Sequence, residues 1–139
     1  MIVAAQADVA PQSVVEVIGI LGAPRVVGDL AARPWHDRIM LDNDHPKVRA
    51  LRADLALALR AAAHHGLAEG VCNHFSAELP DGSGRFLLNP RGFLWAEVQA
   101  DDIVLVDAAG KRLAGRHEVE PTAMFIHAAI HRLAGKAVV

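Results

Sequence analysis

The clearest periodic pattern of apolar and polar positions lies between residues 46 and 66. Apolar residues recur there at spacings of three and four, which places them on one face of an α-helix. Alanines fill many of the intervening positions and favour the same conformation. Asp44 is a candidate N-cap, Pro46 suits the first turn, and Gly66 is a typical C-terminal stop. The pattern predicts a helix with a buried stripe formed by Val48, Leu51, Leu55 and Leu59.

A segment with the pattern of β-structure follows this helix. Residues 71–78 and 85–89 are predicted to be strands, and the Pro, Asp, Gly and Ser residues at 80–84 are typical of a turn between them. We therefore expect a hairpin. The tight turn at residues 90–92 comes next, followed by a short helical turn at 95–99.

The pattern alternates again toward the end of the chain. Residues 103–107 are predicted to be a strand, and a turn leads into a partner strand that begins at residues 112–113. A second helix is expected to begin at Pro121 or Thr122 and to end at Gly135.

Both ends of the chain carry apolar segments outside this pattern. Residues 137–139 have the character of the first residues of a buried strand. The apolar run at residues 14–21 is followed by repeated Gly and Pro residues, which gives no regular period. We expect an irregular leader at residues 1–43 and a single domain at residues 44–139.

Composition narrows the class of protein. The 139 residues are 53% hydrophobic and 22% charged, with a formal net charge of -2, so a core is expected and a concentrated basic surface for nucleic acid is not. No Lys or Arg precedes Arg25, which argues against a signal peptide, and Pro11 and Pro24 argue against a membrane span. The single cysteine, Cys72, cannot form an internal disulfide, so we expect a cytoplasmic protein in which this residue is a small buried hydrophobe.

Five short motifs then follow one another in the chain. Residues 65–70 end the first helix, Asn-His-Phe-Ser occupies 73–76, and further motifs lie at 86–92, 101–107 and 121–131. Their order resembles the class II aldolase/adducin family over about residues 47–139. The resemblance implies an α/β fold, here an incomplete three-layer α/β/α arrangement around a central mixed, mainly antiparallel sheet. Family members include sugar-phosphate aldolases, a pentulose-phosphate epimerase, decarboxylases and the non-catalytic head of adducin.

The resemblance also implies where a metal would bind. Family enzymes use a divalent ion, usually zinc, to polarise a carbonyl group. Their first two ligands form a His-x-His pair on the strand after the second helix, which corresponds here to residues 137–139, and the sequence contains no such pair. Zinc is therefore expected only in a full-length relative, and we expect no metal ligand in this chain.

The resemblance also implies roles for other histidines and for the acidic residues. His127 and His131 are four residues apart, a spacing that can bind metal on a helix, but the resemblance favours helix packing for both. The aldolases carry an acid/base Glu at the position of Ala123, and neither Glu118 nor Glu120 aligns with it. We therefore expect no catalytic residue in this chain. Trp95 is expected to pack rather than to stack on a substrate.

The anion-binding positions of the family are better matched. Glycine lets the backbone approach an anion, helix N-terminal amides donate to it, and an Arg adds a charge-assisted contact. For Asn89 and Gly92 a simple turn is an equally good interpretation, and Ser76 could be an ordinary strand hydroxyl. The candidate substrate- or anion-binding residues are Asn73, His74, Ser76, Asn89, Arg91, Gly92 and Thr122.

Two functions of different kinds remain open. The first is a fragment of a metal-dependent carbon–carbon lyase, decarboxylase or epimerase, acting on a small sugar or hydroxy/oxo acid and inactive alone. The alternative is a non-catalytic binding or oligomerisation module like the adducin head. A weaker idea is a small domain that complements another chain. In each case we expect a homo-oligomer, with no nucleic acid or membrane partner and with an anionic small molecule as the candidate ligand.

Overall fold

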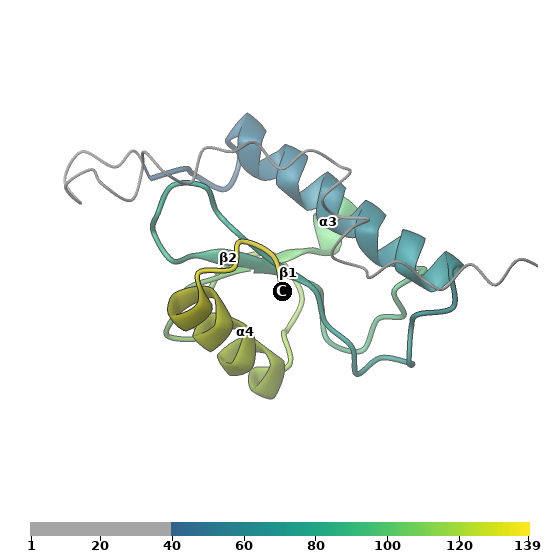
Figure 1. Ribbon diagram of the computed structural model, residues 1–139. Coiled ribbons are helices and arrows are strands. Elements are labelled where there is room, and N and C mark those ends of the chain that lie inside the picture. Colours follow the sequence, from purple (N-terminus) through teal and green to yellow (C-terminus); the bar gives the residue numbers. More distant parts are fainter. Residues whose placement is uncertain (1–39) are drawn as a thin grey trace, which may run out of the picture.

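A computed structural model describes residues 40–139, and it places a helix on each face of an antiparallel sheet (Figure 1). Helix α3 (Pro46–His64) covers one face and helix α4 (Pro121–Ala134) the other. The predicted three-layer α/β/α arrangement is confirmed. Nearly all of the predicted leader lies outside the described residues.

The sheet has four short strands in the order β1-β2-β3-β4. Every pairing in it is antiparallel, in keeping with the mainly antiparallel sheet that was predicted. A short 3-10 helix, η2 (Ala100–Asp102), precedes β3. The strands are β1 (Ser76–Glu78), β2 (Phe86–Leu88), β3 (Val104–Val106) and β4 (Arg112–Ala114).

Strand register decides which side chains face which helix. Ala77, Leu87 and Leu105 are aligned across the sheet and pack with the stripe of α3. Neighbouring positions face the opposite way, because side chains alternate along a strand. Leu88 and Val104 therefore pack against α4. Ser76 is aligned with Leu88, so its hydroxyl also points toward α4.

Helix α3 was predicted in the right place but with the wrong cap. The N-cap is His45, whose Nδ1 accepts a hydrogen bond from the Lys47 amide at 3.2 Å. Pro46 at the first position favours an extended residue before it, which fixes the helix start at residue 46. Asp44 lies one residue too early and donates its own amide to Asp42 instead.

Three further predictions need correction. Residues 71–75 are not part of β1, because the Phe75 amide donates to the Asn89 side chain rather than to a strand. The helical turn predicted at 95–99 is a hydrogen-bonded turn at residues 95–97, and helical geometry occurs at η2, where Asp102 caps the Gln99 amide. Residues 137–139 do pair with β1, but Ala137 is exposed and the two valines are half-buried.

Leu41 belongs to the core although it lies in the predicted leader. It is 8% exposed, and its amide donates to Asp81 at 3.0 Å while its carbonyl accepts from Arg85. The turn of the β1–β2 hairpin thus holds the segment that enters α3. No helix within residues 40–139 has the length and apolar character of a membrane span.

Candidate functional site

A pocket of about 300 Å³ opens at the N-terminal end of α4. Pro121 occupies the first position of this helix, and Glu120 is its N-cap without a side-chain cap bond. The first amides of a helix have no partners within it, so this end carries partial positive charge and attracts anions. The pocket is lined by Cys72, His74, Glu120, Thr122, Ala123, Ile126 and His127.

A buried polar cluster lies behind His127, one of the residues that line the pocket. The Ser76 hydroxyl lies 2.7 Å from His127 Nδ1 and 2.7 Å from His131 Nε2. All three side chains are buried, and His131 also contacts the Lys136 carbonyl oxygen. Burial, together with the nearby His74 and His131 rings, lowers the pKa of His127 to about 4. The cluster is therefore neutral at pH 7.

His74 contributes a second imidazole to the pocket lining. Its ring lies edge-on to that of His127, with centroids 6.4 Å apart, and its Nε2 is buried without a hydrogen-bond partner. Burial lowers the pKa of His74, although the charge of Glu120 and a hydrogen bond with the Cys72 backbone act in the opposite direction. A buried nitrogen without a hydrogen-bond partner is costly to the fold.

Arg91 reaches the pocket through an ion pair with one of its lining residues. Its Nε lies 3.2 Å from Glu120 Oε2, and its side chain is 64% exposed. The Arg91 amide donates to the Glu118 carbonyl at 2.8 Å, which joins the turn at residues 90–92 to the segment before α4. The guanidinium thus offsets the negative charge of Glu120 and keeps further donors facing solvent.

The Asn89 side chain stabilises the segment that carries His74 by hydrogen bonds to the residues on either side of it. Asn89 is 1% exposed, accepts the Phe75 amide at 2.9 Å and donates to the Asn73 carbonyl at 3.3 Å. That carbonyl also accepts the Trp95 indole at 2.9 Å, and the Trp95 ring packs on Phe75 with centroids 4.5 Å apart. The prediction that Trp95 packs in the core is confirmed.

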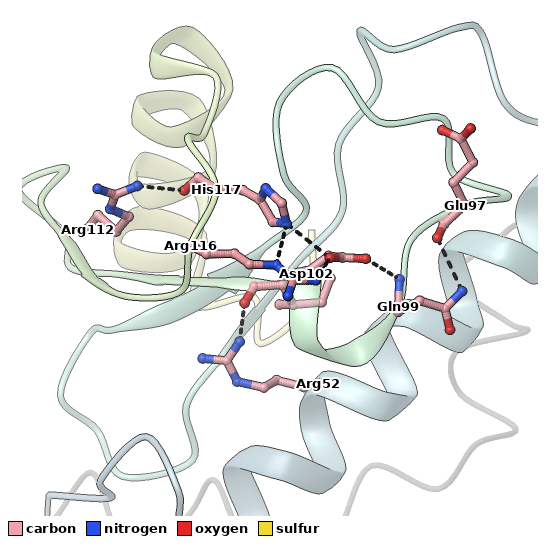
Figure 2. A network of polar contacts seen from close by, with 8 residues as sticks. Arg52, Glu97, Gln99, Asp102, Arg112, Arg116 and His117 are labelled. Atoms are coloured by element: carbon pink, nitrogen blue, oxygen red, sulfur yellow. Dashed lines mark hydrogen bonds and ion pairs between the residues drawn. The ribbon is translucent and has the colours of Figure 1, made fainter.

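A second polar network holds the segment that leads into α4 (Figure 2). Asp102 accepts from Arg116 at 2.7 Å and from the Gln99 amide at 3.0 Å, and it contacts His117 at 3.0 Å. Burial raises the pKa of Asp102, but these hydrogen bonds outweigh it and hold the pKa below its ordinary value. On the other side of this junction, Arg52 of α3 donates to the Ile103 carbonyl. Helix α3 and the segment before α4 are thereby tied to residues 102–103, just before β3.

The described residues do not fit the divalent metal that the family resemblance implies. Residues 40–139 contain no group of three or more His, Cys, Asp or Glu side chains arranged to hold a metal ion. Between His127 and His131, the position that a shared metal would occupy is taken by the Ser76 hydroxyl.

The predicted site residues are only partly brought together. His74 and Thr122 line the pocket, Arg91 reaches it through Glu120, and Ser76 lies behind it. The remaining three, which do not line the pocket, are Asn73, Asn89 and Gly92.

Five of the residues that line the pocket were not among the predicted site residues, and three of these, Cys72, Glu120 and His127, have titratable side chains. Cys72 is exposed rather than buried, because residues 71–75 lie outside the sheet. Glu120 was set aside because it does not align with the family's acid/base position. His127 was assigned to packing, and the sequence signal that links it to the site is its spacing from His131 together with the inward-facing Ser76.

Comparison with known proteins identifies the domain. The family model described as the Class II Aldolase and Adducin N-terminal domain matches residues 53–139. A presumed class 2 aldolase protein of Pseudomonas aeruginosa is 40% identical over 83 residues, which cover 59% of this chain and 32% of that protein. An adducin-related protein of Schizosaccharomyces pombe is 32% identical over 93 residues, which cover 60% of this chain and 28% of that protein. The chain thus spans about a third of the length of these relatives.

Solved structures give the same result. An aldolase II superfamily protein from Pseudomonas syringae is 29% identical with a TM-score of 0.63, over 74% of this chain and 40% of that one. The L-fuculose 1-phosphate aldolase from Glaciozyma antarctica is 25% identical with a TM-score of 0.59, over 74% of this chain and 41% of that one. The chain belongs to the class II aldolase and adducin N-terminal domain family.

Proposed function

We propose that this domain supplies the substrate-anion side of a carbon–carbon lyase, decarboxylase or epimerase of the metal-dependent type, acting on a small sugar or hydroxy/oxo acid. The observation that carries the proposal is the pocket at the N-terminal end of α4, which both Thr122 and His74 line. The unpaired amides of the first helical turn and the nearby Arg91 favour a phosphate or carboxylate there. Similarity to a protein named as an L-fuculose 1-phosphate aldolase supports the same class of ligand.

The proposal assigns no chemical step to a metal held by the described residues. His131 uses both ring nitrogens within the fold, and His127 uses Nδ1. We propose that the 139-residue chain binds its ligand without turning it over. Chelator-sensitive cleavage of a carbonyl substrate by the purified chain would contradict this part of the proposal. A cytoplasmic location is proposed from the lone Cys72 thiol.

Anion binding can be tested by titrating the chain with inorganic phosphate and following backbone amide chemical shifts. We expect the largest changes at Thr122 and Ala123, and several-fold weaker binding in Arg91→Gln and Thr122→Val. Arg112→Gln is the matched control, because Arg112 forms a similar exposed ion pair with Glu118 at 2.7 Å on a neighbouring segment. Equal weakening in all three variants, or no shift at the start of α4, would count against an anion site.

A second candidate function is an assembly module like the adducin head. The specific observation in its favour is the outer face of α4, where Phe125 and Leu133 are 57% and 77% exposed. Large apolar side chains gathered on one exposed face are typical of interaction surfaces. The relative named as adducin-related is consistent with this alternative. We propose a homo-oligomer for both candidate functions, because the outer face of α4 is exposed whether the domain binds a ligand or serves only in assembly.

A further inference from the structure

Three side chains form a continuous hydrogen-bonded path from the end of α4 to the pocket. His131 Nδ1 contacts the Lys136 carbonyl oxygen, and His131 Nε2 lies 2.7 Å from Ser76 Oγ. Ser76 Oγ in turn lies 2.7 Å from Nδ1 of His127, which lines the pocket. Because every contact in this path has one donor and one acceptor, the position of each proton can be worked out.

The direction of the path follows from its carbonyl end. A carbonyl oxygen only accepts, so the neutral His131 ring carries its proton on Nδ1 and accepts at Nε2. The Ser76 hydroxyl therefore donates its single proton to His131. Toward His127 the Ser76 oxygen can only accept, so His127 carries its proton on Nδ1. The opposite side of the His127 ring, with Nε2 as a free acceptor, is left for the pocket.

Burial favours the neutral form of both the His127 and the His131 ring. It is the largest cause that lowers the pKa of His131 and the pKa of His127. The charged or titratable groups near the His127 ring are His74, His131 one turn along α4, and the pocket residues Glu120 and Cys72. Glu120 is paired with Arg91, so its charge is partly offset.

We infer that His127 Nε2 accepts a hydrogen bond from a hydroxyl group of the bound ligand. This inference rests on the anion-binding function proposed above. Ser76 and His131 are positioning residues, because they fix the tautomer that makes Nε2 an acceptor. The pocket thus combines an anion-binding helix end with an imidazole acceptor, and it selects hydroxylated anions over analogues of the same charge that lack the hydroxyl.

The tautomer can be read directly from a long-range proton–nitrogen correlation spectrum of the histidine rings in the full chain at about pH 7. We expect a protonated Nδ1 and a bare Nε2 for His127. The ligand role is tested with sn-glycerol 3-phosphate and n-propyl phosphate, which share charge and chain length but differ in hydroxyl groups. Wild type should bind the first about three- to tenfold more tightly, the effect of one or two neutral hydrogen bonds.

Two variants separate His127 from its supports. His127→Phe and Ser76→Ala should lose most of the preference for glycerol 3-phosphate while still binding propyl phosphate. His64→Gln on α3 is the control and should keep it, because His64 is exposed and takes no part in the path. Near-ultraviolet circular dichroism checks that each variant folds. Should His127→Phe fail to fold, Ser76→Ala and the wild-type spectrum still decide the question.

A proton on Nε2 of His127 in the wild type would overturn the inference, and so would an unchanged preference in both variants. If neither phosphate binds while the His127 tautomer is as expected, the anion-binding function has failed and the ligand role fails with it. The proton positions along the path would then stand alone. The two failures are therefore told apart by the spectrum.

Discussion

At the scale of single residues, His127 makes the stability of the domain depend on pH. Burial, with the rings of His74 and His131, lowers its pKa from 6.5 to about 4 in the folded state. Between these values the unfolded chain binds a proton that the folded domain does not, so stability is lost as the pH falls through this window. From about pH 7.5 to about pH 5 we expect a loss on the order of 2 kcal/mol from this residue.

Urea unfolding at the two pH values measures this loss. The difference between wild type and His127→Phe isolates the share of His127 from that of the carboxylates, which titrate in both proteins. His64→Gln serves as the control, since His64 is exposed on α3. An equal pH dependence in wild type and His127→Phe would show that the imidazole is not held neutral by the fold.

Asn89 illustrates a residue whose structural role outweighs a binding role. Both ends of its buried amide are used within the fold, by the Phe75 amide and the Asn73 carbonyl. Asn89→Ala leaves a partly buried N–H without a partner and should destabilise the domain by about 2–3 kcal/mol. Asn73→Ala is the matched control with a small expected cost, because Asn73 contributes its backbone carbonyl. Chemical denaturation measures both, and similar costs would argue against this role of the Asn89 side chain.

The same residues show what could be predicted of the site and what could not. Thr122 and His74 were predicted because the motifs shared with the family include the start of the second helix and the segment at residues 73–76. Glu120 and Cys72 could not be found this way, because their place in the pocket depends on how the segments before α4 and β1 come together. Asn89 was ambiguous for a physical reason, since an amide that binds a ligand and one that braces a loop have the same sequence signature.

At the scale of elements, both helices and all four strands were predicted near their observed positions. The pattern of apolar residues predicts these positions. Strands β2 and β3 are buried on both faces and appear as continuous apolar runs, and α3 has one apolar stripe. The cap of α3 and the position of η2 were missed. Both depend on specific side-chain bonds, from His45 and from Asp102, that compete with equally plausible neighbours.

The segment between β4 and α4 is held by a glycine that contacts the backbone of β3. Gly115 has φ +108°, and a Cβ atom there would lie 3.1 Å from Val104 Cα. Gly115→Ala combines backbone strain with a contact that cannot relax, so we expect a loss of about 2–3 kcal/mol. Gly66→Ala is the control: its φ is +72° but the space around it is open, and about 1 kcal/mol is expected. Thermal unfolding that ranks the two variants in the reverse order would contradict this account.

At the scale of the whole molecule, the two helices differ in how much apolar surface they expose to solvent. The outer face of α4 exposes Phe125 and Leu133, and the C-terminal residues that follow the helix pair with the edge of β1. Burial of these side chains in an interface with a second copy of the chain would be favourable. We therefore expect the purified chain to self-associate through α4.

Sedimentation velocity over a range of concentrations tests the expectation. Leu133→Lys places a charge on the exposed face of α4, near a helix C-terminus that tolerates a cation, and should weaken association about tenfold or more. Leu57→Lys is the matched control, because Leu57 is 47% exposed on α3 and lies on the other side of the sheet. A wild-type chain that stays monomeric at all concentrations, or equal weakening by both variants, would remove α4 as the interface.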